Sequence, residues 1–278
     1  YQAELYPVHC RLSLPSVPEK GKGVACEKID GEAKILCDCR MNHLSRPWPL
    51  RAGPIGWLLA AVACVAVTAA VAAFDPQISA FAQSLPGPVI AVAGVVTHVG
   101  DSAFVLVPAL VIWLLSTLFA AIIAKPAPKR ALWQVAGIWS FVFIGVGLPG
   151  LFTTIVKRII GRARPALVET EGALGFQPGA WIDWLHQSFP SGHTTTAFAT
   201  CFVLSFLAPK WHPALLILAC VVGLSRIALG AHYATDVIAG AVVGTLGAYL
   251  VRNAFASRCW VFERRPDGTF ARRPLLAV

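Results

Sequence analysis

The segment "SRIALGAHYATD", residues 225–236, holds an arginine, a histidine and an aspartate between two apolar runs. Ionisable side chains at membrane depth are costly to bury and usually have a function. His232 and Asp236 are four residues apart, which predicts that they share one face of a helix. Asp236 would then accept a hydrogen bond from one imidazole nitrogen and leave the other nitrogen free as a nucleophile or base. The alternative is a buried ion pair, which includes Arg226 and joins two helices.

A second segment, "KRIIGRARP" at residues 157–165, ends another apolar run with four cations. These cations are Lys157, Arg158, Arg162 and Arg164. Lys157 and Arg164 are seven residues apart, about two helical turns, so we expect them on one helix face, with Pro165 ending the helix. The alternative is a set of cations that reach from a helix end to the membrane surface.

A third segment, "FPSGHTTTAF" at residues 189–198, combines a turn with the start of an apolar run. Pro190, Ser191 and Gly192 predict the turn, and His193 then opens a helix. The free backbone N–H groups at a helix start, together with the Ser191 hydroxyl, favour an anion. The alternative is a simple N-cap beside an incidental histidine.

The composition indicates a membrane protein. Of 278 residues, 56% are hydrophobic and 13% are charged, whereas a soluble domain has about 25% charged residues. The net charge is +9, but no basic run with interleaved aromatics lies in a soluble segment, so we expect no nucleic-acid partner. The predicted fold is all-α and polytopic, with six transmembrane helices. The predicted spans are 55–74, 102–124, 131–156, 192–208, 213–229 and 234–251.

The distribution of apolar runs divides the chain into three regions. Residues 1–50 are polar and lack a hydrophobic period, which predicts a disordered segment. Met41 is the only methionine, so residues 1–40 are interpreted as a possible upstream extension. Residues 51–252 form the membrane domain and 253–278 a basic tail. The first span also resembles a signal peptide, but its length favours a span that is not cleaved.

Cysteines and capping residues add two smaller expectations. Four cysteines of the N-terminal segment match no familiar zinc spacing, so no metal site is predicted there. They are Cys10, Cys26, Cys37 and Cys39. Asp101 and Ser102 precede the second span and are expected to cap it.

With six spans, all three charged segments lie on the same side of the membrane. Together they supply cations, neutral donors at a helix start and two histidines. This inventory suits a phosphate, because cations and backbone donors stabilise the charge of a transferring phosphoryl group. One histidine would attack phosphorus and the other would protonate the leaving oxygen.

The three segments also resemble the signature motifs of the type 2 phosphatidic acid phosphatase superfamily. The matching positions are Lys157, Arg164 and Pro165; Pro190, Ser191, Gly192 and His193; and Ser225, Arg226, His232 and Asp236. The resemblance covers about residues 55–252 and shows no departure at these positions.

The resemblance implies a role for each matched residue. His232 would form a phosphohistidine, Asp236 would orient it, and His193 would be the general acid for the leaving alcohol. The remaining positions would bind the substrate phosphate: Lys157, Arg164, Ser191, Gly192 and Arg226. The family needs no metal and no other cofactor. Arg158 and Arg162 are not signature positions and are interpreted as interfacial cations.

The predicted function is hydrolysis of a membrane lipid phosphate or diphosphate. Two alternatives remain: a lipid-linked phosphotransferase on the same scaffold, and a non-catalytic membrane binding protein. The presence of both His193 and His232 argues against the second. Soluble vanadium haloperoxidases share this site architecture, but six spans argue against that class. Phosphatidylglycerophosphate, phosphatidic acid, polyprenyl diphosphates such as undecaprenyl diphosphate, and lipid A all stay open as substrates, and the sequence gives no oligomeric state.

The distribution of Lys and Arg predicts the orientation, because cytoplasmic loops carry an excess of both. One side of the six-span arrangement holds Arg46, Arg51, Lys125, Lys129, Arg130, Lys210, Arg252, Arg258, Arg264, Arg265, Arg272 and Arg273. The other side holds only cations of the charged segments: Lys157, Arg158, Arg162, Arg164 and Arg226. We therefore expect a multi-pass protein of the cell membrane, with both termini in the cytoplasm and the site at the outer, periplasmic face.

Overall fold

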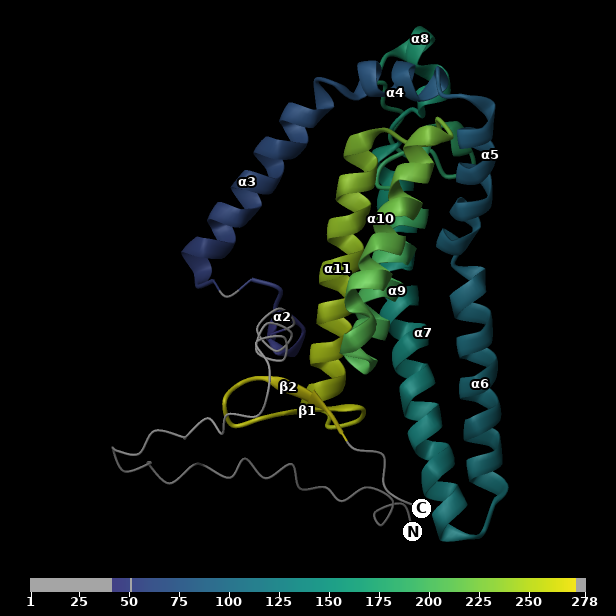
Figure 1. The fold of residues 1–278 in the computed structure, drawn as a ribbon, viewed down its shortest axis with the longest axis vertical. Coiled ribbons are helices and arrows are strands. Elements are labelled where there is room, and N and C mark those ends of the chain that lie inside the picture. The colour runs from purple at the N-terminus through teal and green to yellow at the C-terminus, as the bar shows by residue number, and fades with distance from the viewer. Residues whose placement is uncertain (1–41, 51, 274–278) are drawn as a thin grey trace, which may run out of the picture.

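The structure is a computed structural model that describes residues 42–50 and 52–273. Its long helices run roughly side by side, except that α3 leans away from the others (Figure 1). The six long helices are α3 (Pro54–Ala72), α6 (Ala103–Ile122), α7 (Pro126–Ile160), α9 (Gly192–Leu207), α10 (His212–Ala228) and α11 (Ala234–Ser257).

Short elements connect these helices. The short α-helices are α2 (Asn42–Ser45), α4 (Asp75–Gln83), α5 (Gly87–Val96) and α8 (Val168–Glu171). The 3₁₀ turns are η1 (Thr97–Gly100), η2 (Pro165–Leu167), η3 (Trp184–His186) and η4 (Pro209–Trp211). Two strands, β1 (Phe262–Arg264) and β2 (Phe270–Arg272), follow α11. α4 and α8 lie at one end of the bundle and the strands at the other (Figure 1).

The structure confirms the prediction of an all-α, multi-pass membrane protein. Within the described residues, five stretches are long and apolar enough to cross a membrane. They contain α3, α5 with α6, α7, α10 and α11. α9 has 16 residues, fewer than the ~20 that usually span a bilayer. The six predicted spans thus correspond to the six long helices, although α7 extends beyond residues 131–156 at both ends.

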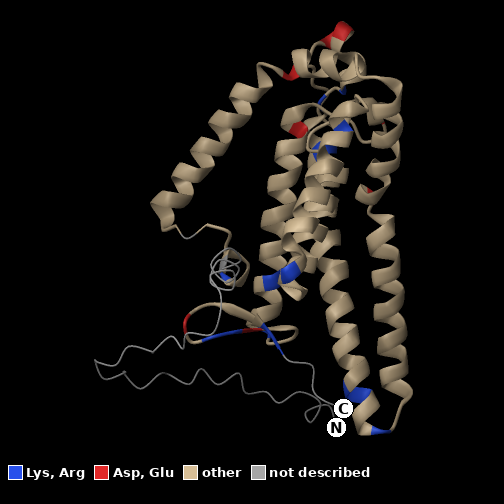
Figure 2. Ribbon diagram, viewed as in Figure 1, with Lys and Arg blue, Asp and Glu red and all other residues tan. Residues whose placement is uncertain are grey.

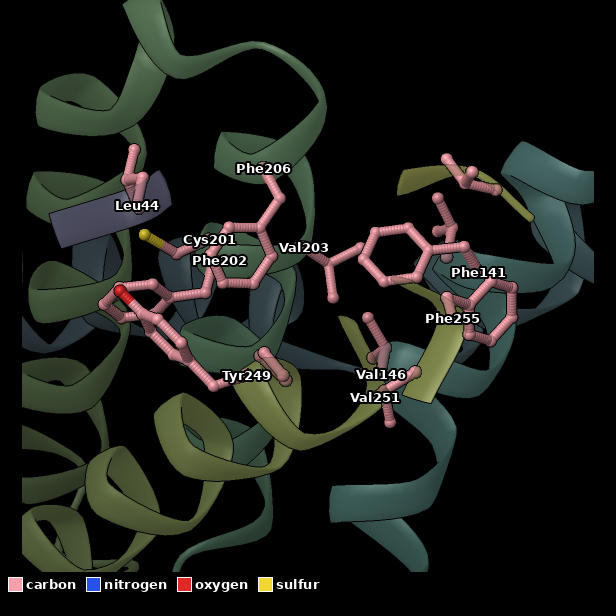
Figure 3. Packing of buried hydrophobic residues seen from close by; sticks show 14 of the residues in the cluster. Leu44, Phe141, Val146, Cys201, Phe202, Val203, Phe206, Tyr249, Val251 and Phe255 are labelled. Carbon is pink, nitrogen blue, oxygen red and sulfur yellow. The ribbon is translucent and has the colours of Figure 1, made fainter. Parts of the chain in front are cut away.

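α9 is the central helix of the bundle, and it packs against α7, α10 and α11. Aromatic rings fill the space around it: Phe206 packs edge-on against Tyr249 with ring centroids 4.9 Å apart, and Phe202 lies beside both (Figure 3). The start of α9 approaches α11 at Gly240, where an added Cβ would lie 2.6 Å from the Ser191 carbonyl oxygen. Small residues allow such close backbone contact between membrane helices. The same contact holds the start of α9 against α11.

The packed domain begins before residue 51, which differs from the predicted boundary. The buried Arg252 side chain donates hydrogen bonds to the carbonyl oxygens of Leu44, Arg46 and Pro47. Leu44 is itself buried in the core. Most of the segment predicted to be disordered, residues 1–41, lies outside the described residues.

The C-terminal region contains more structure than a basic tail. α11 continues to Ser257, and β1 pairs with β2 as an antiparallel hairpin in which Phe262 lies opposite Arg272. The Phe262 side chain is buried and packs against Phe141 with ring centroids 4.8 Å apart. This hairpin is a small exception to the all-α prediction, and it closes the end of the bundle opposite α4.

Asp101 alone fulfils the expected cap of the second span. Its Oδ1 accepts a hydrogen bond from the Ala103 N–H at 3.0 Å. The Ser102 side chain makes no capping hydrogen bond.

Candidate active site

α7 ends at a glycine rather than at the proline that the sequence suggested. Gly161 adopts φ +67°, and its N–H bonds the carbonyl oxygen of Lys157, which is the usual way for a helix to end on a left-handed residue. An added Cβ at Gly161 would lie 1.7 Å from the Gln177 carbonyl oxygen, so only glycine fits. Pro165 lies in η2, beyond this turn. The prediction that Lys157 and Arg164 share a helix face is therefore wrong.

Lys157 nevertheless reaches the start of α9. A Cβ added to Gly192, the first residue of α9, would lie 3.3 Å from the Lys157 Nζ. The ammonium group thus lies beside the free N–H groups of the helix start. Both features favour an anion at this point.

Arg164 lies in the loop that connects α7 to α9. Its Nε donates to the Trp184 carbonyl oxygen at 3.0 Å, and its Nη1 donates to the Ala231 carbonyl oxygen at 3.3 Å. Burial lowers the pKa of its guanidinium from the ordinary value, but arginine remains charged at neutral pH. Arg164 therefore brings a cation to the turn before α11.

Ser191 caps α9, which was the alternative interpretation of this segment. Its Oγ accepts from the Thr194 N–H at 3.5 Å and from the Thr194 hydroxyl at 3.0 Å. Its own N–H donates to the Asp236 carbonyl oxygen at 3.0 Å, which fixes the start of α9 to the start of α11. His193 follows in the first turn of α9.

His232 and Asp236 lie together, although not on one helix. α11 begins at Ala234, so His232 precedes it, and the predicted shared helix face is wrong. The His232 Nδ1 still lies 3.6 Å from Asp236 Oδ2, an ion-pair distance slightly longer than a hydrogen bond. Burial lowers the pKa of His232 to about 4, so the imidazole is neutral at pH 7 and can act as a nucleophile.

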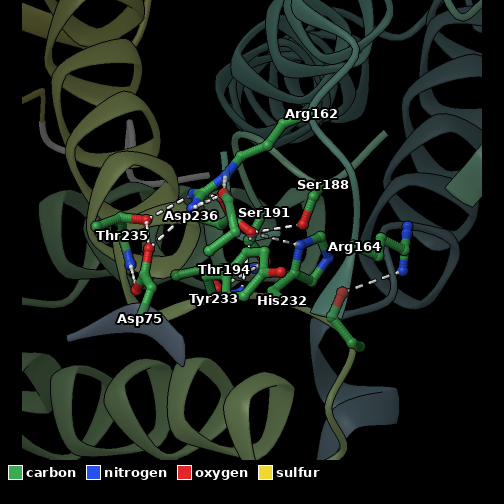
Figure 4. A network of polar contacts seen from close by, with 12 residues as sticks. Asp75, Arg162, Arg164, Ser188, Ser191, Thr194, His232, Tyr233, Thr235 and Asp236 are labelled. Atoms are coloured by element: carbon green, nitrogen blue, oxygen red, sulfur yellow. Dashed lines mark hydrogen bonds and ion pairs between the residues drawn. The ribbon is translucent and has the colours of Figure 1, made fainter. Parts of the chain in front are cut away.

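Three donors hold the Asp236 carboxylate in place (Figure 4). Oδ2 accepts from the Ser188 hydroxyl at 2.6 Å and from the Tyr233 N–H at 2.9 Å. Oδ1 accepts from the Arg162 guanidinium at 2.6 Å. Since Asp236 is fully buried, these contacts fix its orientation toward His232.

Arg226 approaches the site from the end of α10. Its Nη1 donates to the Thr97 hydroxyl of η1 at 2.6 Å. Its Nε is buried and has no hydrogen-bond partner among the described residues. A buried donor without a partner is costly, so an anion bound here would stabilise it.

Arg162 is the residue that the sequence interpretation placed wrongly. It was expected at the membrane surface, but only 4% of it is exposed and it bonds Asp236 and Asp75. Asp75, a single acidic residue directly after an apolar span, indicated that a cation would pair with it, but the sequence does not relate it to Arg162. Ser188, Thr97 and Asp75 are the other contributing residues that the sequence interpretation missed.

His186 links two parts of the loop that contains Arg164. The two His186 ring nitrogens lie 2.9 Å from Glu171 Oε2 and 2.6 Å from Asp183 Oδ2. The hydrogen bond to Glu171 is the main reason why the pKa of His186 is raised, and the hydrogen bond from His186 lowers the pKa of Asp183. These two contacts of His186 hold the loop in place at the end of the bundle.

Comparison with known proteins identifies the family. The PAP2 superfamily profile matches residues 137–260. The chain is 32% identical over 195 residues to a lipid A 1-phosphatase of Rhizobium johnstonii, covering 70% of this chain and 79% of that protein. It is 33% identical over 121 residues to a decaprenylphosphoryl-5-phosphoribose phosphatase of Mycolicibacterium smegmatis, covering 44% and 58% of the two chains.

One solved structure is also among the matches. It is a transmembrane PAP2-type phosphatidylglycerolphosphate phosphatase from Bacillus subtilis, 22% identical, with a TM-score of 0.45 and coverage of 69% of this chain and 94% of that one. The match to the Rhizobium protein extends over more than two thirds of both chains, and the PAP2 profile matches this chain as well. The chain therefore belongs to the PAP2 superfamily.

Proposed function

We propose that the protein hydrolyses a membrane lipid phosphate or diphosphate through a phosphohistidine intermediate. The observation that carries the proposal is the position of the His232 Nδ1, which lies 3.6 Å from the fixed Asp236 Oδ2 at the same end of the bundle as the start of α9. Lys157, at that helix start, contributes the first cation of a phosphate site. A nucleophile next to an anion site is the arrangement that phosphoryl transfer requires.

The reaction has two balanced steps. The free imidazole nitrogen of His232 attacks phosphorus, the bond from phosphorus to the leaving oxygen breaks, and His193 gives that oxygen a proton. Water then attacks the phosphohistidine, the P–N bond breaks, and His193 takes the proton of the water. Asp236 stabilises the positive charge that develops on His232 in the first step. A phosphotransferase would replace water by another acceptor in the second step.

The phosphate oxygens are expected to be held by the predicted donors. The cations are Lys157, Arg164 and Arg226, and the neutral donors are Ser191 and Gly192 at the start of α9. Three cations can balance the charge of a phosphate monoester, so we propose that no divalent metal and no other cofactor takes part. The Arg226 Nε, a buried donor without a partner, supports this assignment.

The proposed substrate class is an envelope lipid that carries a phosphate on its headgroup, such as a lipid A 1-phosphate. The match over 70% of the chain to a lipid A 1-phosphatase supports this choice. A polyprenyl phosphate or diphosphate is the second candidate, because the chain is also similar to a decaprenylphosphoryl-5-phosphoribose phosphatase.

Phosphate release by the purified protein in detergent tests both proposals. The substrates are lipid A, phosphatidylglycerophosphate, phosphatidic acid and undecaprenyl diphosphate, each with EDTA and with vanadate. We expect the highest kcat/KM with lipid A, full activity in EDTA, and inhibition by vanadate, which adopts the five-coordinate geometry of a transferring phosphoryl group. Activity that is lost in EDTA and restored by Mg²⁺ would contradict metal independence. No release from any of these lipids would contradict the function.

We also propose that the site faces the outside of the cell membrane and that both termini are cytoplasmic. Basic residues lie at both ends of the bundle (Figure 2). At the α4 and α8 end they belong to the charged segments, whereas the opposite end carries the larger number, including those at the start of α7, in α11 and in the hairpin. Lys125, Lys129 and Arg130 at the start of α7 belong to the basic end. The excess of Lys and Arg on cytoplasmic segments supports this orientation.

Labelling of introduced cysteines tests the orientation. Thr170→Cys lies in α8 near the site, and Asp267→Cys lies in the turn of the hairpin at the other end; both positions are exposed. In intact cells, a membrane-impermeant maleimide should label Thr170→Cys above the level of the unaltered protein, and Asp267→Cys only after permeabilisation. The reverse pattern would place the site on the cytoplasmic side.

A further inference from the structure

A buried arginine connects the proposed catalytic aspartate to a second carboxylate from a distant part of the chain. The Arg162 Nη1 donates to Asp236 Oδ1 at 2.6 Å, and its Nη2 donates to Asp75 Oδ2 at 2.9 Å (Figure 4). The Arg162 side chain is 5% exposed, and both carboxylates are fully buried. Asp75 is the first residue of α4, the short helix that follows the first span.

Thr235 completes the link between these groups. Its hydroxyl donates to Asp75 Oδ2 at 2.5 Å, and its N–H donates to Asp75 Oδ1 at 3.3 Å. The same hydroxyl accepts a hydrogen bond from the Arg162 Nη1 at 2.6 Å. The Arg162 guanidinium also lies over the Tyr233 ring, 4.4 Å from its centroid. Within the described residues, the hydrogen bonds of the Asp75 side chain are thus all with Arg162 or with Thr235, the residue directly before Asp236.

The charges of this group explain why two carboxylates are needed. Arg162 contributes one positive charge, while Asp75 and Asp236 contribute two negative charges, and His232 is neutral before reaction. If Arg162 were paired with Asp236 alone, its charge would cancel that of Asp236 toward His232. Because Asp75 shares the guanidinium, Asp236 keeps net negative charge for the cation that forms on His232 when its nitrogen bonds to phosphorus.

We propose that Asp75 is a positioning residue for phosphoryl transfer, acting through Arg162 on the orientation and charge of Asp236. The proposal rests on the proposed function, in which His232 is the nucleophile. Asp75 itself does not touch the substrate. Its role is to leave Asp236 free to orient and stabilise the His232 imidazole, much as an outer group orients a reactive ligand.

The first test compares Asp75→Asn with a matched control. Asn keeps the size of the side chain and removes its charge. Glu169→Gln makes the same chemical change at an exposed residue of α8 at the same end of the bundle. We expect Asp75→Asn to lower kcat by about 10- to 100-fold, the effect typical of groups that orient a reactive ligand, with KM little changed. Glu169→Gln should match the wild type in both constants.

Rapid-quench measurement of the phosphoenzyme separates a positioning role from a loss of fold. The amplitude of the first turnover counts the competent sites, and its rate constant reports the attack by His232. Asp75→Asn should retain the amplitude and lower the rate constant. A lower amplitude with an unchanged rate constant would show that Asp75 only supports the fold, and would overturn the proposal. Asp75→Glu, which restores the charge, should regain part of the rate.

A double-mutant cycle tests whether Asp75 acts through Arg162. The variants are Asp75→Asn, Arg162→Gln and the two together. Once Arg162 has lost its charge, Asp75 has nothing to neutralise, so the double variant should be about as slow as Arg162→Gln alone. Losses that multiply independently would contradict the coupling. Arg162→Lys should also be slow, because a single ammonium cannot bridge two carboxylates as the guanidinium fork does.

The failure of this inference can be distinguished from failure of the proposed function. If His232→Ala retains activity, the phosphohistidine mechanism fails whatever Asp75→Asn shows. If His232→Ala is inactive while Asp75→Asn behaves like Glu169→Gln, only the role of Asp75 fails.

Discussion

His232→Ala is expected to abolish turnover, with a loss on the order of 10³-fold or more, because the substitution removes the proposed nucleophile. The Asp236 carboxylate beside it is fully buried, and both of its oxygens accept hydrogen bonds from other groups, so it is not placed to attack phosphorus in the same way. Steady-state phosphate release from lipid A by the purified variant measures the loss. His98→Ala is the matched control, because His98 is exposed in η1 at the same end of the bundle and should keep wild-type activity.

The intermediate itself provides a second measurement on the same variant. Wild-type protein quenched during turnover of ³²P-labelled substrate should carry a label that is lost in acid and stable in base, as expected for a phosphohistidine. His232→Ala should carry none, and His98→Ala should carry as much as the wild type. Label that persists on His232→Ala would assign the nucleophile to another residue.

His193→Ala should slow the reaction by an amount that depends on the leaving group. A lipid alcohol is a poor leaving group and needs a proton, so the loss with a lipid phosphate should be about 10²- to 10⁴-fold. A p-nitrophenyl leaving group departs without a proton, so the loss with a p-nitrophenyl phosphate should be much smaller. The rate constant of phosphoenzyme formation, measured with both substrates, gives the comparison. Equal losses with both would show that His193 binds phosphate rather than donating a proton.

Local spacing predicted the grouping of charged residues better than their geometry. His232 and Asp236 lie within ion-pair distance as expected, yet they do so across the start of α11 rather than along it. The helical-face argument failed at Lys157 and Arg164 because Gly161 reverses the chain between them. Helices commonly end on a glycine in the left-handed conformation, so Gly161 was the signal in the sequence that α7 ends there.

The position of Arg162 could not be predicted in the same way. Its partner Asp75 is 87 residues away, and no periodicity or motif in a single sequence relates the two. A cation at the end of a span is most often exposed to headgroups, so the neighbouring sequence favoured the interpretation of Arg162 as an interfacial cation. In the structure Arg162 is buried instead, because the chain turns at Gly161 and Arg162 then lies inside the bundle.

The length of α9 determines how deep in the membrane the proposed site lies. Its 16 residues extend about 24 Å, compared with about 30 Å for the hydrocarbon layer. The end of α9 far from the site is followed by η4, which holds Lys210 and Trp211, residues suited to a membrane–water interface. With that end at one interface, the start of α9 would lie about 6 Å inside the opposite boundary of the hydrocarbon layer. In the proposed reaction, the substrate phosphate would then have to leave the hydrated headgroup layer and move toward the acyl chains, and we expect lipids that resist this dehydration to be poor substrates.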